Sequence, residues 1–250
     1  MISNINLFTS GARKVYASHL FYLMVPIWGL LFGVGYLIAM PSPGVGFGIW
    51  SLVSAIALLV FYIYFLCKQA NGMLEFSTAI AGEGKFPSLM FKITGITAIV
   101  MLVVFVLTLI FVIVNAFIHI KFITDGLTII QLVNLTACIL FFASNLAGFI
   151  GLSGRRSFPN HNAAILGVVA YSLYFVTIII AVFLFKNMGM SGPTAFMRLM
   201  SILLIICIIS TFVLSAITWN RMSKTFLSNQ NFAQDQNPYG NNPDQTQYRG

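Results

Sequence analysis

Residues 93–118 read ITGITAIVMLVVFVLTLIFVIVNAFI and contain no ionisable side chain. A helix of this length measures roughly 39 Å at about 1.5 Å per residue, against roughly 30 Å of bilayer hydrocarbon. Inside lipid, every backbone N–H and C=O must be hydrogen-bonded within the segment, which a helix achieves. The stretch therefore predicts a membrane-spanning helix, and the rest of the chain is interpreted around it.

Five further apolar segments are long enough to cross a bilayer. The sequence therefore predicts an all-α, polytopic integral membrane protein with six spans, at about 17–40, 47–67, 93–118, 128–152, 163–185 and 195–219. Residues 1–16 are expected to form a cytoplasmic N-terminal segment. Residues 68–92 are expected to form an inner loop with a short amphipathic helix, because Met73, Phe76 and Ile80 recur at helical spacing. Residues 220–250 are expected to form a disordered, Asn/Gln-rich cytoplasmic tail.

The composition excludes an ordinary water-soluble domain. Apolar residues make up 59% of the 250 residues, charged residues make up 7%, and the mean hydropathy is +0.94. A soluble domain usually carries about 25% charged residues. The net charge of +8 does not indicate nucleic-acid binding, because the basic residues occupy the loops between spans. Ten of the 13 Lys and Arg fall in predicted inner segments, which places both termini in the cytoplasm by the positive-inside rule.

The predicted outer loops are short and contain no N-x-S/T acceptor for glycosylation, and the first span lacks a convincing cleavage site. These features favour a bacterial inner membrane. The lipid bilayer is the first partner that the sequence implies. Other membrane subunits or a homo-oligomer are further expected partners, together with a cytoplasmic protein bound through the inner loop 68–92 or the tail 225–250.

Two spans carry polar residues at helical spacing. Gln131, Asn134 and Asn145, with Cys138, share one face of the fourth span. Ser201, Thr211 and Ser215 share one face of the sixth span. Because amides are costly in hydrocarbon, the fourth-span face should meet protein or water. Hydroxyl groups can bond the carbonyl four residues earlier in their own helix, so the sixth-span stripe is the weaker signal.

Two charges are predicted at the outer mouth of the bundle. Asp125 belongs to an outer turn, and Arg198 opens the sixth span on the side that disfavours cations. Arg198 is expected to extend its side chain so that the guanidinium group reaches the outer surface. The alternatives are an ion pair with Asp125 or a contact with an anionic headgroup or substrate.

No residue pattern in the sequence predicts catalysis, a metal site or a cofactor. Gly151-Leu152-Ser153-Gly154 has the G-x-S-G lettering of rhomboid-type proteases, but those enzymes need a histidine on a later helix and none follows His161. No carboxylate lies well inside a predicted span, so the carboxylate-based proton or sodium relay of many transporters is missing.

Two functions remain open from the sequence. The first is a transport or export permease, or its membrane subunit, because the length, six passes and inner loop resemble the plan of membrane subunits of ATP-driven exporters. The second is a non-catalytic structural or assembly subunit of a larger membrane complex. The two differ in what the amide face of the fourth span contacts: water in a permease, and neighbouring protein in an assembly subunit.

Overall fold

The computed structural model describes residues 2, 4–39, 45–118, 121–187 and 195–226. This part is built from six long helices and contains no strand. They are α1 (Ile5–Ala39), α2 (Val45–Ala79), α3 (Lys85–Ile118), α4 (Lys121–Ser153), α5 (His161–Asn187) and α6 (Ala195–Lys224). A single turn of 3₁₀ helix, η1 (Ala81–Glu83), joins α2 to α3.

Four helical segments in the described part are long and apolar enough to cross a membrane. They are Lys85–Phe111 of α3, Leu132–Ser153 of α4, His161–Leu184 of α5 and Leu199–Lys224 of α6. The prediction of a multi-pass, all-helical membrane protein is therefore confirmed. Many side chains of these segments are exposed and apolar, such as Ile179 at 68% and Leu132 at 64%, as a lipid-facing surface requires.

The helices extend further at the basic end than the sequence boundaries anticipated. Residues 68–79 continue α2, and α3 already begins at Lys85, so the expected inner loop reduces to a short break around η1. Residues 5–16 likewise belong to α1. The reason is local, because 68–79 contains no proline and its one glycine, Gly72, lies inside a helix–helix contact. Gly84, with a φ of +154°, then allows the chain to turn into α3.

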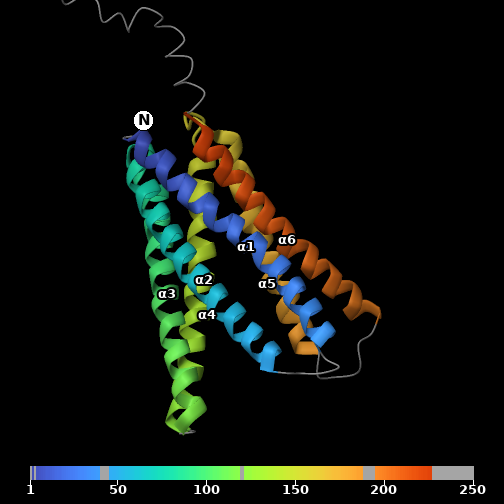
Figure 1. Cartoon of the computed structure of the whole chain (residues 1–250). Helices are drawn as coiled ribbons and strands as arrows, with labels where there is room; N and C mark the ends of the chain where they lie inside the picture. The colour runs from blue at the N-terminus through green and yellow to red at the C-terminus, as the bar shows by residue number, and fades with distance from the viewer. Residues whose placement is uncertain (1, 3, 40–44, 119–120, 188–194, 227–250) are drawn as a thin grey trace, which may run out of the picture.

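The helices pack in a ring in which each one contacts the next along the chain, and α6 closes the ring against α1. Figure 1 shows the helices gathered near the N-terminus and diverging toward the opposite end, where the α3–α4 pair stands apart from α5 and α6. The tightest packing is therefore at the end that carries the N-terminus and the end of α6.

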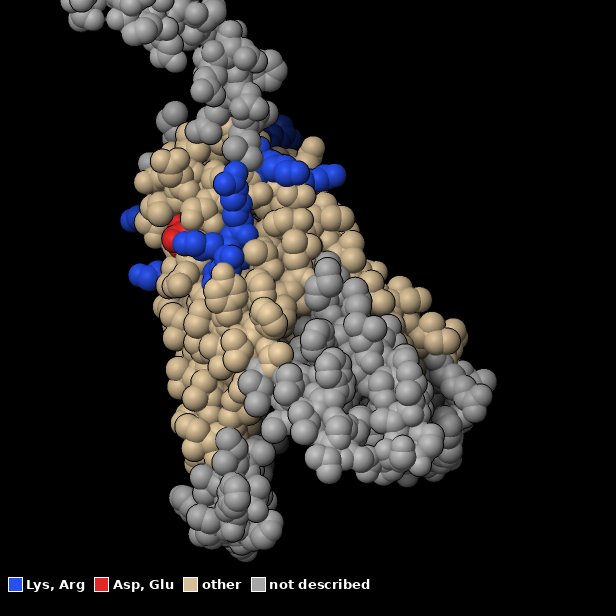
Figure 2. Space-filling view, in the orientation of Figure 1, with Lys and Arg blue, Asp and Glu red and all other residues tan. Residues whose placement is uncertain are grey.

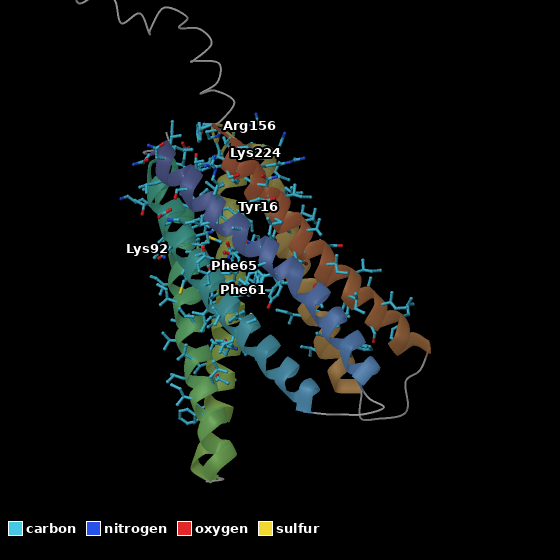
Figure 3. The ribbon with its side chains drawn as sticks, in the orientation of Figure 1. Tyr16, Phe61, Phe65, Lys92, Arg156 and Lys224 are labelled. Atoms are coloured by element: carbon cyan, nitrogen blue, oxygen red, sulfur yellow. The ribbon has the colours of Figure 1, made fainter. Side chains whose placement is uncertain are left out.

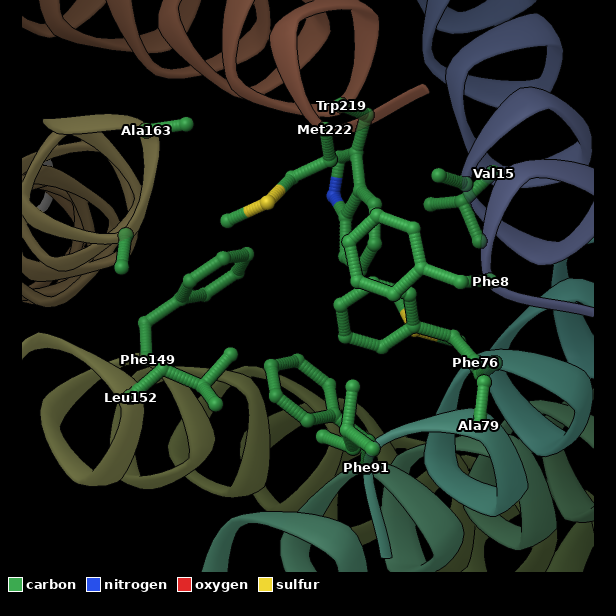
Figure 4. Packing of buried hydrophobic residues seen from close by; sticks show 14 of the residues in the cluster. Phe8, Val15, Phe76, Ala79, Phe91, Phe149, Leu152, Ala163, Trp219 and Met222 are labelled. Carbon is green, nitrogen blue, oxygen red and sulfur yellow. The ribbon is translucent and has the colours of Figure 1, made fainter. Parts of the chain in front are cut away.

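An aromatic cluster fills the ring at this end. Phe76 is the centre, with its ring centroid 4.8 Å from Phe8, 5.1 Å from Phe91 and 5.0 Å from Trp219 (Figure 4). Phe149 extends the cluster, 5.1 Å from Phe91 and 5.4 Å from Trp219. All five side chains are fully buried. Tilted and edge-to-face contacts of this kind add about 0.5–1.5 kcal/mol per pair beyond the buried area.

The basic side chains lie around the same end. The part of the chain with described side chains holds nine Lys and Arg residues, all in the end of the bundle near the N-terminus, where Figure 2 shows the blue patches. They are Arg13, Lys14, Lys68, Lys85, Lys92, Arg155, Arg156, Arg221 and Lys224. The sequence grouped these same nine residues on the inner side, and the fold brings them together.

Candidate functional site: a cavity between the six helices

A cavity of about 220 Å³ lies inside the ring of helices. Its wall takes side chains from every one of them: His19 and Tyr22 of α1, Tyr62, Leu66 and Gln69 of α2, Met101 of α3, Cys138, Phe141 and Phe142 of α4, Tyr174 of α5, and Thr211, Phe212 and Ser215 of α6. This lining contains no Asp, Glu, Lys or Arg. The cavity is therefore an uncharged chamber with aromatic walls and a few hydrogen-bonding groups.

The cavity lies beyond the aromatic cluster as seen from the basic end. On α1, His19 follows Phe8, and on α6, which runs the other way, Ser215 precedes Trp219. On α4, Cys138 likewise precedes Phe149. The fully buried rings of Phe8, Phe149 and Trp219 therefore separate the cavity from the basic end.

The depth of the cavity follows from the α3–α4 contact. The hydroxyls of Thr94 and Ser144 lie 2.8 Å apart, so these residues share a level, two residues beyond Lys92. Cys138 is six residues further along α4, which places it roughly 12 Å beyond Lys92 at about 1.5 Å per residue. The cavity residues Met101, Cys138 and Phe141 therefore lie within the apolar segments of α3 and α4 that are long enough to cross a membrane.

A buried hydrogen-bond chain begins at His19 in the cavity wall. Nδ1 of His19 lies 2.9 Å from the Val15 carbonyl, which can only accept, so this nitrogen carries the hydrogen. In the neutral ring Nε2 is then an acceptor, and the Tyr171 hydroxyl donates to it over 3.3 Å. Nε1 of Trp219 donates to the same hydroxyl over 3.1 Å. The chain joins α1, α5 and α6, with every link buried.

Two further polar contacts lie in the cavity wall. The Tyr22 hydroxyl donates to Oε1 of Gln69 over 2.8 Å, linking α1 to α2. The Cys138 sulfur and the Tyr174 hydroxyl lie 3.2 Å apart, linking α4 to α5. The ring of Tyr174 also stacks on Phe142. These contacts hold the polar atoms of the wall in defined positions, although each belongs to a different pair of helices.

The amide face predicted on α4 divides along its length. Asn145 is fully buried, and Nδ2 donates to the Phe141 carbonyl over 2.9 Å. Asn134 is exposed on the outer surface of α4. Both residues share one helical face, but that face is covered only near the basic end, because the α3–α4 pair diverges from α5 (Figure 1). The side chain of Gln131 lies outside the described residues.

The hydroxyl stripe predicted on α6 divides in the same way. Thr211 and Ser215 are buried and line the cavity, whereas Ser201, nearer the opposite end, is exposed. Thr211 donates to the Cys207 carbonyl over 2.8 Å, as a hydroxyl inside a helix commonly does. The side chains of Asp125 and Arg198 lie outside the described residues, so their pairing stays a prediction.

Most of the cavity wall was not anticipated from the sequence. Tyr62 and Trp219 stand near the ends of their predicted spans, where aromatic residues are expected at the membrane interfaces. Tyr62 instead lines the cavity, and Trp219 is fully buried. The sequence of one helix does not show whether an aromatic residue near its end faces the bundle or the surface. No signal in the sequence therefore marked Tyr62 and Trp219 as inward-facing.

In the described part of the chain, no group of three or more His, Cys, Asp or Glu could hold a metal ion. No protein-family model, curated protein sequence or solved structure matches the chain.

Proposed function

We propose that the chain is a transport permease, or the membrane subunit of one, in which a solute occupies the cavity between the six helices. The cavity is the observation that supports this proposal. Protein interiors are normally filled by side chains, and polar groups at hydrocarbon depth are costly unless they serve a pathway or a contact. Here all six helices contribute to one empty space, and hydroxyl, amide and thiol groups are placed in its wall.

The proposal includes a topology. We propose six spans with both termini in the cytoplasm, because the nine described basic side chains surround the end that carries the N-terminus and the end of α6. A bacterial inner membrane is proposed on the short outer loops of the sequence.

The lining indicates the class of solute. A dry cavity of about 150 Å³ can hold benzene, so about 220 Å³ suits a compact molecule only somewhat larger. The described wall offers no charge to balance an ion, while its aromatic rings and its Gln69, Thr211 and Ser215 groups suit an uncharged molecule that can form a few hydrogen bonds. The aromatic cluster closes the basic end, so passage requires Phe76, Trp219 and their neighbours to separate.

Reconstituted liposomes test this proposal. The purified protein is assayed for uptake of labelled glycerol, a monosaccharide and a neutral amino acid, with potassium and chloride as charged comparisons. Cys138→Phe places a ring in the cavity and should abolish uptake of whichever neutral solute passes. Ile205→Phe makes a comparable change at a side chain that is 56% exposed on the surface of α6 and should retain uptake. Absence of uptake for every solute, or equal uptake in Cys138→Phe, contradicts the proposal.

An exposed amide supports a second candidate, a non-catalytic subunit of a membrane complex. Asn134 is ten residues from Ser144 on α4 and so lies roughly 18 Å further from the basic end than Lys92, at about 1.5 Å per residue. It belongs to the apolar segment Leu132–Ser153, which is long enough to cross a membrane. An amide on that surface would be matched by a polar group of a neighbouring subunit.

A photo-crosslinking residue distinguishes the second candidate from the first. Placed at position 134, it should capture a membrane protein of fixed mass in cells if α4 lies against a subunit, and at Ile179, on the exposed surface of α5, it should not. Native mass measurement then identifies a homo-oligomer or a hetero-complex. Capture of lipid alone at position 134 removes this candidate. Neither candidate assigns a catalytic step to the chain.

A further inference from the structure

A basic cleft lies where the beginning of α1 crosses the end of α2. It has a volume of about 390 Å³, and its lining combines basic, neutral polar and apolar side chains: Arg13, Lys14 and Lys68, then Asn6, Thr9 and Ser10, then Ile5 and Phe226. The cleft is thus both cationic and apolar. It is separate from the cavity between the six helices, with which it shares no lining residue.

One of the three cations is already paired. Lys14 forms an ion pair with Glu75 of α2, and the Ser10 hydroxyl donates to the other oxygen of the same carboxylate over 2.9 Å. Arg13 is exposed and Lys68 is half-buried. The cleft therefore carries a net charge of two, from three cations and one carboxylate, which is enough to attract one phosphate group.

Lys68 is held in place by its own helix. Its Nζ lies 5.3 Å above the centre of the Tyr64 ring and 3.4 Å from the Tyr64 hydroxyl. Tyr64 lies one turn further from the basic end than Lys68, so its ring continues the surface of the cleft in that direction.

An apolar track leads from the cleft along the seam between α1 and α2. Phe61 and Tyr64 are more than half exposed on α2. The rings of Phe21 on α1 and Phe65 on α2 stack across the seam with centroids 4.6 Å apart. Figure 3 shows Tyr16 nearest the basic end, then Phe65, then Phe61 along this direction. The order from charge to aromatic surface matches that of a phospholipid, from headgroup to acyl chain.

We propose that the basic cleft binds the phosphate of an anionic phospholipid, with Arg13 and Lys68 as the cations and the acyl chains along Phe61 and Phe65. The apolar track is the reason for choosing a lipid over free phosphate, which would use only the charged end. The inference does not depend on the proposed transport function.

Native mass spectrometry of the full chain in mild detergent tests it with phosphatidylglycerol and phosphatidylcholine offered together. Phosphatidylglycerol should be retained preferentially. One Lys or Arg near an anionic lipid surface raises the binding affinity about fivefold. Arg13→Gln and Lys68→Gln should therefore each weaken the retention of phosphatidylglycerol by about that factor. Lys92→Gln removes an exposed cation on α3, away from the seam (Figure 3), and should leave retention unchanged.

A second pair of variants separates the charge from the track. Glu75→Gln keeps an acceptor for Ser10 but frees Lys14, so it should strengthen retention of phosphatidylglycerol. Phe61→Ala should weaken the retention of a long-chain phosphatidylglycerol. Displacement of the lipid by millimolar inorganic phosphate alone would show a free-phosphate site instead. Equal retention of the two lipids, or an equal loss in Lys92→Gln, would overturn the proposal.

Discussion

Gly11 and Gly72 meet where α1 crosses α2, so closely that a Cβ atom on Gly11 would lie 2.6 Å from the Gly72 carbonyl oxygen. A Cβ atom on Gly72 would in turn lie 2.8 Å from the Gly11 carbonyl oxygen. The obstructing atoms belong to the backbone and cannot rotate away. The two glycines therefore set the separation of the helices beside the basic cleft.

Replacing either glycine should force α1 and α2 apart. Gly72→Val is expected to lower the free energy of unfolding by about 1–3 kcal/mol or more, which is the usual cost of overpacking. Thermal unfolding in detergent measures the change. Gly154→Ala is the control, because the nearest atom to its Cβ would lie at 3.6 Å and the substitution should be tolerated. Equal stability of Gly72→Val and the wild type would show that the crossing is looser than described.

Removing the Tyr171 hydroxyl should cost more than removing an exposed one. Tyr171→Phe leaves Nε1 of Trp219 and Nε2 of His19 without their shared partner in a buried site. We expect a loss of about 1–3 kcal/mol, against about 0.6 kcal/mol for an average hydrogen bond between membrane helices. Tyr64→Phe, at a residue 55% exposed, serves as control. Similar unfolding temperatures for the two variants would refute a structural role for the chain.

The sequence was sufficient for the class of fold but not for the cavity. The apolar run 93–118 predicted a long helix, and the placement of the basic residues predicted that nine cations lie at one end of the bundle. Both predictions succeeded because both signals depend on local composition. Helical spacing also placed Thr211 and Ser215 on one inward face, and both line the cavity.

The remainder depends on how the helices are rotated and how far they stay together. Asn134 and Asn145 share a face, yet one is exposed and the other buried, because α3 and α4 leave the ring partway along. The contact between Gly11 and Gly72 joins residues from segments that were assigned to a terminal segment and a loop. No pattern within either segment reveals that they touch.

Asn145 and Ser144 differ in how much each should contribute to the stability of the fold. Its Oδ1 is buried and accepts no hydrogen bond from the described residues, while Nδ2 is bonded to its own helix. Because an unpaired buried acceptor is costly, Asn145→Leu should leave stability unchanged or raise it by about 1 kcal/mol. Ser144→Ala, which removes the 2.8 Å contact with Thr94, should lower stability instead. A clear loss in Asn145→Leu would indicate that Oδ1 has a partner such as an ordered water.

The two cysteines of α4 and α6 should differ in their reaction with small thiol reagents. Cys138 is partly exposed and lines the cavity, whereas Cys207 is buried beside Ile180 and Leu184. In a Cys67→Ser background, N-ethylmaleimide should therefore label Cys138 faster than Cys207, as peptide mass analysis would measure.

Filling the cavity gives the control for this labelling. Ser215→Leu adds bulk to the wall of the same cavity and should slow the reaction at Cys138 without changing the reaction at Cys207. A membrane-impermeant, charged reagent should label Cys138 more slowly than N-ethylmaleimide, since the described wall carries no charge to stabilise it. Faster labelling of Cys207, or no effect of Ser215→Leu, would mean that small molecules do not reach Cys138 through this cavity.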